Sequence, residues 1–515
     1  MSVFKTETSG KISLEAVEKG ESSGTADTST AETPSDSNSD VSATVELRHF
    51  QMFGYGFGHF YNDLCASMWF TYLMIFLENV LGFRSSISGL LMLIGQIVDA
   101  VCNPLVGIAS DSSLLPAWFE RRVGKRTSWH VIGTICVTIS FPFVFNQCPV
   151  FNKDNSEWWC FGWFVLFIAI FQFGWSAVQT PSTATDSVSS LHQFQIAHLA
   201  LIPELTQSPC RRATLSSLRY ASTVLANLAV YGILAIFLNN DNGQSTVTSK
   251  DLKHFSNAAY IVIVVGVVAT GIFYVLTKEP KGYEKKLSNE GASTSADTSH
   301  ISSIKPMTFL NWLSEPQFYQ ISALYTLSRL YMNVSQVYLP FYVTFGQNFS
   351  KAFVAIIPMV CYAASFFFTI PTSIQRFNRY INKKVIFIVG CIFGIANCIW
   401  MRFPLNEASL FIVAIIFGGV QAVLLVGSLA FSSDMINKNT ESAAFVFGAM
   451  SFLDKLANGV AYQIIELFNP ECKDGENNHA CTEFYRSIMA YIPGGCLMLA
   501  LLVLLTLLTK KIGVR

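Results

Sequence analysis

Long apolar runs recur along this chain from residue 53 to residue 508, and they constrain its fold more than any other feature. Each run is long enough, at about 20 residues, to cross the hydrocarbon core of a bilayer as an α-helix. Six runs precede a polar segment and six follow it: 53–79, 86–109, 129–146, 158–179, 213–238 and 257–277, then 316–345, 352–374, 385–401, 408–433, 443–468 and 484–508. The sequence therefore predicts an all-α polytopic membrane protein with twelve transmembrane helices; ten and eleven are the alternative counts.

The composition agrees with a membrane protein, because only 13% of the residues are charged and 51% are hydrophobic. Ordinary soluble domains carry roughly 25% charged residues, and a single soluble core cannot bury this much apolar surface. The formal net charge is zero, which gives no indication of nucleic-acid binding. We find no convincing nucleophile–base pair, phosphate loop or metal-ligand cluster, so we expect no enzymatic activity, no cofactor and no metal site.

The predicted domains are two six-helix bundles, at 47–277 and 316–509, joined by a cytosolic linker at 278–315. Residues 1–46 are rich in Ser, Thr and acidic residues, which is the composition of a disordered tail. A second short tail covers 510–515. Six spans, a linker and six spans form a two-fold repeat, as in carriers that rock two bundles about a central site.

Basic residues in the loops predict the orientation in the membrane. They gather in the loops that share a side with the N-terminus, and the other loops hold one or two each, so both termini are predicted to be cytosolic. Four cysteines lie in the loops after the third and eleventh spans, on the side that is usually oxidising. They are candidates for disulfides, with four unpaired thiols as the alternative: Cys148, Cys160, Cys472 and Cys481.

Several ionisable residues lie inside the apolar runs, where each is a functional candidate because burial in lipid costs several kcal/mol. Both halves contribute to them: Asp63, Asp99 and Arg219 from the first, and Arg329 and Lys455 from the second. Their distribution suits a central cavity between two bundles.

Structural roles are the alternatives for these charges. Asp63 is alternatively a helix cap, Asp99 a permanently paired acid, and Lys455 the partner of a buried carboxylate. Arg329 is expected to extend toward the membrane surface rather than to bind substrate. Three acids at span ends are expected to be solvated: Glu78, Asp434 and Glu466.

A glycine and an acid precede a basic loop between the second and third spans. Glycine permits close helix contact, and the basic residues mark the cytosolic side. The residues of this predicted conformational motif are Gly107, Asp111, Arg121, Arg122, Lys125 and Arg126.

This motif resembles the signature of the major facilitator superfamily. The stretch from Gln96 through Asp99 to Asn103 and Pro104 resembles the span-two motif of its glycoside–pentoside–hexuronide:cation symporters. From residue 53 onward the chain is also similar to a group of animal lysosomal and melanosomal cysteine importers, for example over 62–72, 171–175, 201–205 and 450–459.

The resemblance implies roles for particular residues. Asp63 and Arg219 would contact substrate, while Asp99 would serve the coupling cation together with Lys455. Asn103 stands in place of a second acid of the span-two motif, and a glutamine, either Gln179 or Gln195, stands in place of a span-four acid. With fewer carboxylate oxygens a sodium site is disfavoured, so the expected coupling is to a proton, or absent.

A polar insert at 180–195 interrupts the fourth apolar region. Backbone at membrane depth must have its hydrogen-bonding groups satisfied within the protein, so we expect an alternative exon that gives a poorly functional isoform. The alternative is that the fourth span ends at Gln179 and the insert is a cytosolic loop.

The predicted function is secondary active transport of the symporter type, by alternating access, with cysteine moved from the cytosol into lysosome-like organelles rather than across the plasma membrane. A zwitterion suits the charges, with its ammonium on Asp63 and its carboxylate on Arg219. A carbohydrate:cation symporter, with Trp69 or Trp175 against the sugar face, is the main alternative. A non-transporting receptor or scaffold is the second, and a lysolipid carrier is disfavoured by the charges. The expected partners are the small solute, a proton and the lipid bilayer, and we expect a monomer.

Overall fold

The computed structural model describes residues 54, 56–111, 114–149, 157–179, 209–239, 246–276, 309–373, 382–436, 443–472 and 479–513, apart from some side chains within these ranges. All of them belong to one compact unit, Glu46–Arg515. The predicted tail 1–46, the insert 180–195 and most of the predicted linker, 278–308, lie outside the described residues.

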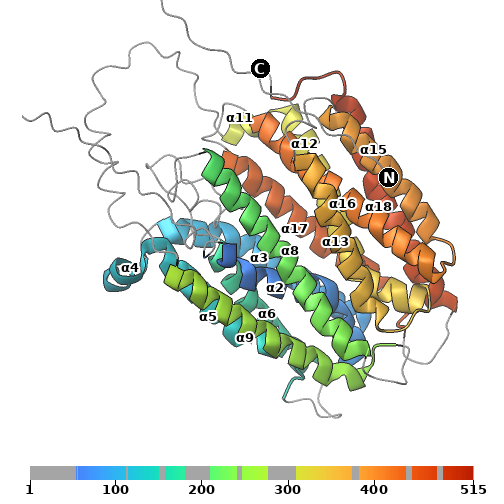
Figure 1. Cartoon of the computed structure of the whole chain (residues 1–515), viewed down its shortest axis with the longest axis horizontal. Coiled ribbons are helices and arrows are strands. Elements are labelled where there is room, and N and C mark those ends of the chain that lie inside the picture. Colours follow the sequence, from blue (N-terminus) through green and yellow to red (C-terminus); the bar gives the residue numbers. More distant parts are fainter. Residues whose placement is uncertain are drawn as a thin grey trace, which may run out of the picture. The chain divides into compact units, whose positions relative to one another are not determined.

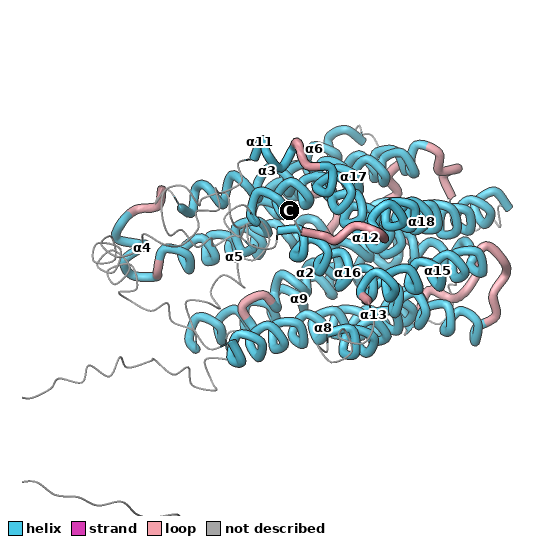
Figure 2. The backbone as a smooth tube through the Cα atoms, turned by 90° about the horizontal axis from the view of Figure 1, so that it is seen from above, coloured by secondary structure: helices cyan, strands magenta, loops and turns pink. Residues whose placement is uncertain are grey.

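Each predicted span contains a long helix, and the described part of the chain contains no strand (Figure 2). The first six helices are α2 (Phe60–Ile75), continued by the π-helix η1 (Phe76–Val80), α3 (Ser85–Asp111), α5 (Lys125–Val144), α6 (Glu157–Gln179), α8 (Pro209–Asn239) and α9 (Leu252–Leu276). The second six are α12 (Pro316–Phe341), continued by the π-helix η3 (Tyr342–Gly346), α13 (Phe353–Ser373), α15 (Lys383–Met401), α16 (Glu407–Ile436), α17 (Ala443–Leu467) and α18 (His479–Leu507). Shorter helices are α4 (Ala117–Val123), η2 (Ser249–Asp251) and α11 (Phe309–Leu313), the last of which lies inside the predicted linker range. The all-α prediction is confirmed.

Eight of the described helices are long and apolar enough by themselves to cross a membrane, and the other four are α2, α12, α13 and α17. The apolar part of α13, Phe353–Thr369, is shorter than in those eight. For α2 the difference follows from its contacts. Almost every residue of α2 is buried against other helices, whereas α9 exposes apolar side chains such as Val264 and Val268, which are 63% and 59% exposed. Since an inner helix faces protein on most sides, it tolerates polar side chains that a lipid-facing helix does not.

The packing of the first six helices is repeated in the second six (Figure 1, blue to green and yellow to red). In the first half, α5 packs on α6, α3 on α6, α2 on α8, α2 on α9 and α5 on α9. The corresponding pairs in the second half are α15 with α16, α13 with α16, α12 with α17, α12 with α18 and α15 with α18. The two-fold repeat predicted from the spans is therefore present in the helix packing.

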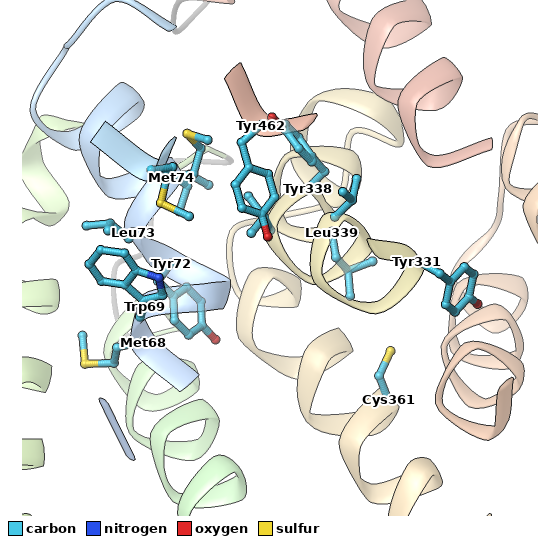
Figure 3. Packing of buried hydrophobic residues seen from close by; sticks show 14 of the residues in the cluster. Met68, Trp69, Tyr72, Leu73, Met74, Tyr331, Tyr338, Leu339, Cys361 and Tyr462 are labelled. Carbon is cyan, nitrogen blue, oxygen red and sulfur yellow. The ribbon is translucent and has the colours of Figure 1, made fainter. Parts of the chain in front are cut away.

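Three helix pairs join the two halves: α2 with α12, α3 with α17, and α8 with α13. Glycines allow α3 and α17 to approach closely, because a Cβ added at Gly459 would lie 2.9 Å from Leu93 Cδ1, and one added at Gly89 would lie 2.8 Å from Glu466 Cβ. In Figure 3, Tyr462 of α17 lies between the labelled side chains of α2 and Tyr338 of α12. The contact between the halves is thus closely packed along α3 and α17.

The four cysteines that were disulfide candidates fall into two classes. Cys472 and Cys481 form a disulfide after α17. Cys148 and Cys160 are free thiols, both buried, that contact each other. A disulfide between Cys148 and Cys160 is therefore not present in this structure.

Candidate functional site

An ion pair between Asp99 of α3 and Lys455 of α17 joins the two halves. Both side chains are largely buried, at 6% and 11% exposure. Lys455 Nζ contacts Asp99 Oδ2, while the other oxygen, Oδ1, accepts hydrogen bonds from Asn103 Nδ2 at 2.9 Å and from Ser176 Oγ at 3.3 Å. The structure thus brings together the three residues predicted to serve the cation, and any motion that separates α3 from α17 must break this pair.

A small pocket lies beside Asp99 and contains about 190 Å³ of empty space. Its walls are mainly aromatic, and Trp69 stacks on Phe171 with ring centroids 5.2 Å apart. The lining residues are Trp69, Phe70, Asp99, Phe171, Gln172 and Trp175. This volume includes solvent at the pocket mouth, and in this conformation the enclosed part has room for little more than one water molecule. Sequence reasoning missed Gln172, because one uncharged amide in an apolar run is not distinctive.

Asp63 lies on α2, two helical turns before Phe70 of the pocket. Both of its carboxylate oxygens are hydrogen-bonded. His59 Nδ1 lies 3.0 Å from Oδ1, and Thr223 Oγ1 of α8 donates to Oδ2 at 2.7 Å. Arg219 is one helical turn before Thr223 on α8, a spacing that places both on one face. The side chain of Arg219 lies outside the described residues. Asp63 is therefore held on the α8 face that carries the predicted arginine.

Another ion pair, Arg329 with Asp454, lies wholly within the second half, with the carboxylate buried and the arginine side chain 26% exposed. Arg329 Nε is 3.3 Å from Asp454 Oδ2, and Asn458 Nδ2 donates to Asp454 Oδ1 at 2.6 Å. The prediction that Arg329 extends toward the membrane surface is wrong, because α17 offers it a buried carboxylate. Of the acids expected to be solvated, Asp434 is 41% exposed and pairs with Lys383.

Uncharged polar side chains also connect the halves. Gln336 of α12 donates to Thr71 of α2 at 3.0 Å, and Tyr362 of α13 donates to Gln336 at 3.3 Å. The same Thr71 hydroxyl hydrogen bonds to Tyr231 of α8 at 3.1 Å, and the Gln336 amide reaches that tyrosine hydroxyl at 3.5 Å. Sequence reasoning missed this network, since glutamine and tyrosine carry no charge that would mark them within an apolar run.

A family model for MFS/sugar transport proteins matches residues 54–509, nearly the whole described part of the chain. The chain belongs to this family. It is 37% identical over 470 residues to the mouse (Mus musculus) major facilitator superfamily domain-containing protein 12, covering 89% of this chain and 93% of that protein. The human (Homo sapiens) protein of the same name is 35% identical, with 88% and 92% covered.

The fold also agrees with solved major facilitator structures. A D-xylose–proton symporter superposes with a TM-score of 0.58 at 13% identity, covering 90% of this chain and 98% of that one. The resemblance predicted from the motifs of the second span and its basic loop is confirmed at the family level. The protein is a multi-pass membrane transporter and not an enzyme.

The other predicted residues that the structure describes do not line the pocket of this major facilitator transporter. Gly107 lies in α3, and Arg121 and Arg122 are exposed on α4. Gln179 is the last residue of α6, whereas Gln195 lies outside the described residues, as do the side chains of Asp111, Lys125 and Arg126. Within the described ranges, no group of three or more His, Cys, Asp or Glu side chains is placed to hold a metal ion.

Proposed function

We propose that this transporter moves a small zwitterionic solute, with cysteine as the substrate, from the cytosol into lysosome-like organelles, and that transport is coupled to a proton at Asp99. The observation that carries the proposal is the Asp99–Lys455 pair, which joins the halves beside the pocket. An ion pair that must break in each cycle is a suitable place for a proton to act.

The two oxygens of Asp99 have different partners, which suggests how coupling works. Oδ1 accepts hydrogen bonds from Asn103 and Ser176, and Oδ2 faces Lys455. A proton arriving on Oδ2 replaces Lys455 as the partner of that oxygen and removes the attraction between α3 and α17. The neutral carboxyl is then also better suited to its apolar surroundings. Protonation therefore favours separation of the two helices.

Substrate recognition is assigned to Asp63 and Arg219. An ammonium group can bind Asp63 by replacing His59 on Oδ1, while Thr223 keeps Oδ2 in place. The guanidinium of Arg219 would hold the carboxylate of the same solute with two hydrogen bonds. Cysteine is favoured by the resemblance to animal cysteine importers, and its binding requires the pocket to widen from this conformation.

The direction of coupling has a thermodynamic constraint. Organelles of this kind have an acidic lumen, so import from the cytosol gains energy from protons only when the two move in opposite directions. Proton symport would instead drive solute out of the lumen. Solute uptake into vesicles with an acidic lumen and into vesicles with an alkaline lumen distinguishes movement in opposite directions from symport.

The test is uptake of radiolabelled cysteine and of glucose into vesicles that contain the full chain, with pH gradients of either sign and with a sodium gradient. We expect pH-driven cysteine accumulation and no glucose uptake. Asp99→Asn should lose accumulation by roughly 5- to 150-fold, the usual range of coupling free energies, yet keep cysteine counterflow. The matched control is Asp434→Asn, which neutralises an exposed acid of the second half. Sodium-driven uptake, or undiminished accumulation in Asp99→Asn, would overturn the proton assignment.

A carbohydrate:cation symporter is the second candidate. The stacked rings of Trp69 and Phe171, with Trp175 in the same pocket, offer a surface for a sugar face. The family name and the solved D-xylose–proton symporter support this candidate. Uptake of a sugar but not of cysteine in the same vesicles would favour it, and uptake of neither would favour a receptor or scaffold.

A further inference from the structure

A pair of buried carboxyl groups, Glu78 and Glu466, joins the halves at the other end of α17. Glu78 belongs to η1 of the first half and Glu466 to the last turn of α17. Both lie on the side of the molecule that carries the Cys472–Cys481 disulfide, here called the disulfide side. The prediction that these acids are solvated is wrong. Glu466 is 2% exposed, and Glu78 Oε1 is buried, because α3 packs against Glu466 through Gly89.

The two carboxyl groups face each other in this buried space. One amide reaches both of them: Asn469 Nδ2 lies 2.6 Å from Glu466 Oε2 and 3.5 Å from Glu78 Oε2. A carboxylate accepts hydrogen bonds but cannot donate them. Because two neighbouring carboxylates cannot both stay charged in a buried space without a large cost, we expect one of them to carry a proton.

The donors around the pair indicate which group is protonated. Glu466 accepts from Tyr338 at 2.6 Å and from Asn469, so both of its oxygens have donors. Glu78 Oε1 has no such donor within the described residues. The charged form is thus better stabilised on Glu466, and the proton belongs on Glu78.

Among the residues that the structure describes, no cation faces the pair to replace this proton. The charged or titratable groups that face the pair in the described part of the chain are Tyr338 of α12, Tyr485 of α18 and Glu471 after α17. From α3 the contacts are Ser85 and the glycine already named. With acids and phenols as neighbours, loss of the proton leaves two like charges in a buried space, which is strongly unfavourable.

We propose that Glu78 and Glu466 form a second proton-binding site, separate from Asp99, which closes the disulfide side when it holds one proton and opens that side when it loses it. The proposal rests on the proposed alternating-access function. In the predicted orientation this side faces the organelle lumen. The lumenal pH then sets how readily this side opens in each cycle: a more acidic lumen favours the closed form, and a rise in pH favours movement of η1 away from α17.

The test is hydrogen–deuterium exchange of the full chain in detergent, followed at η1 and at the end of α17 from acidic to neutral pH and corrected for intrinsic exchange. We expect wild-type protection at acidic pH. Above the titration point of the pair, protection should fall about tenfold per pH unit, as one proton requires. In Glu466→Gln the amide can donate to Glu78 without a proton, so protection should persist at neutral pH. Glu78→Gln should behave in the same way.

Two further variants separate this site from the central one. Asp434→Asn, on a distant exposed acid, should keep the wild-type pH response. Asp99→Asn should keep it as well, because the two sites are distinct. A flat wild-type response overturns the proposal, and so does a response that survives in both Glu variants or disappears in Asp99→Asn. If cysteine is not transported but the exchange response follows these expectations, only the proposed substrate fails.

Discussion

The acids Asp99 and Asp454 lie in different halves of the transporter but have the same local structure. Each is followed four residues later by an asparagine on the same helix, Asn103 on α3 and Asn458 on α17. In both cases the asparagine Nδ2 donates to Oδ1 of the acid and to its main-chain oxygen, at 2.9 and 2.9 Å for the first and 2.6 and 2.7 Å for the second. The local arrangement therefore does not distinguish the two acids.

What distinguishes them is the location and type of the partner. Asp454 pairs with Arg329 inside its own half, whereas Asp99 pairs with Lys455 of the other half. Adjacent residues on α17 thus point to different halves. Arginine stays charged under all ordinary conditions, while a buried lysine can give up its proton. The comparison teaches that the pair within one half suits a permanent structural bond, and the pair between the halves suits a bond that breaks in each cycle.

The largest expected effect comes from removing the acid of the permanent pair. Asp454→Ala leaves Arg329 without its carboxylate in a position where it cannot become neutral, which should cost ~3–5 kcal/mol of unfolding free energy. Asp99→Asn should cost less, because Lys455 can become neutral. Thermal unfolding in detergent measures both. Equal losses of stability would remove the distinction between the two pairs.

The sequence was sufficient for the fold and for part of the site. The spans, the repeat and the family all follow from apolar length and local motifs, which are short-range features. It also identified Asp99 and Lys455 as candidates, because a charge inside an apolar run is conspicuous.

The sequence did not predict in the same way which residues form ion pairs with each other. Whether Lys455 or its neighbour Asp454 faces the other half depends on the rotation of α17, which close packing at Gly459 and Gly89 sets. For the same reason Glu466 looked solvated at a span end, although a neighbouring helix covers it.

The next effect concerns substrate binding, which the proposed function assigns to Asp63 and Arg219 of the first half. Asp63→Ala and Arg219→Ala should each weaken cysteine binding by ~2–5 kcal/mol, since each removes one side of a charged contact. Arg329→Lys, a charge-conserving control in the second half, should retain binding. Affinity is measured by equilibrium binding, with a thermal melt to verify folding. Wild-type affinity in a folded Asp63 or Arg219 variant would exclude that residue from the site.

The cysteines allow a comparison of stability between the halves. Removing the second-half disulfide with Cys472→Ser and Cys481→Ser opens a loop whose ends are 9 residues apart, which should cost ~2–3 kcal/mol if chain entropy dominates. Cys148→Ser and Cys160→Ser in the first half remove two thiols and no cross-link, so they should respond to reductant no differently from wild type. Thermal unfolding with and without reductant tests this. A reductant-sensitive first half would show that Cys148 and Cys160 are bonded in the protein as isolated.

The smallest expected effect separates a hydrogen bond between the halves from one within a half. Tyr220 of α8 donates to Thr369 of α13 at 3.1 Å across the interface, whereas Tyr274 of α9 bonds to His130 of α5 at 2.7 Å within the first half. Each Tyr→Phe change removes one hydroxyl and is worth ~0.5–1.5 kcal/mol. In Tyr220→Phe we expect this energy to appear as faster counterflow, roughly 2- to 12-fold, because α8 and α13 separate more readily, with little change in melting temperature. In Tyr274→Phe it should instead appear as a lower melting temperature at an unchanged counterflow rate.

Thr369→Val combined with Tyr220→Phe should add nothing to the single change, as a shared bond requires. Identical effects of the two tyrosines on rate and stability would mean that bonds between the halves are not those that limit the transport cycle.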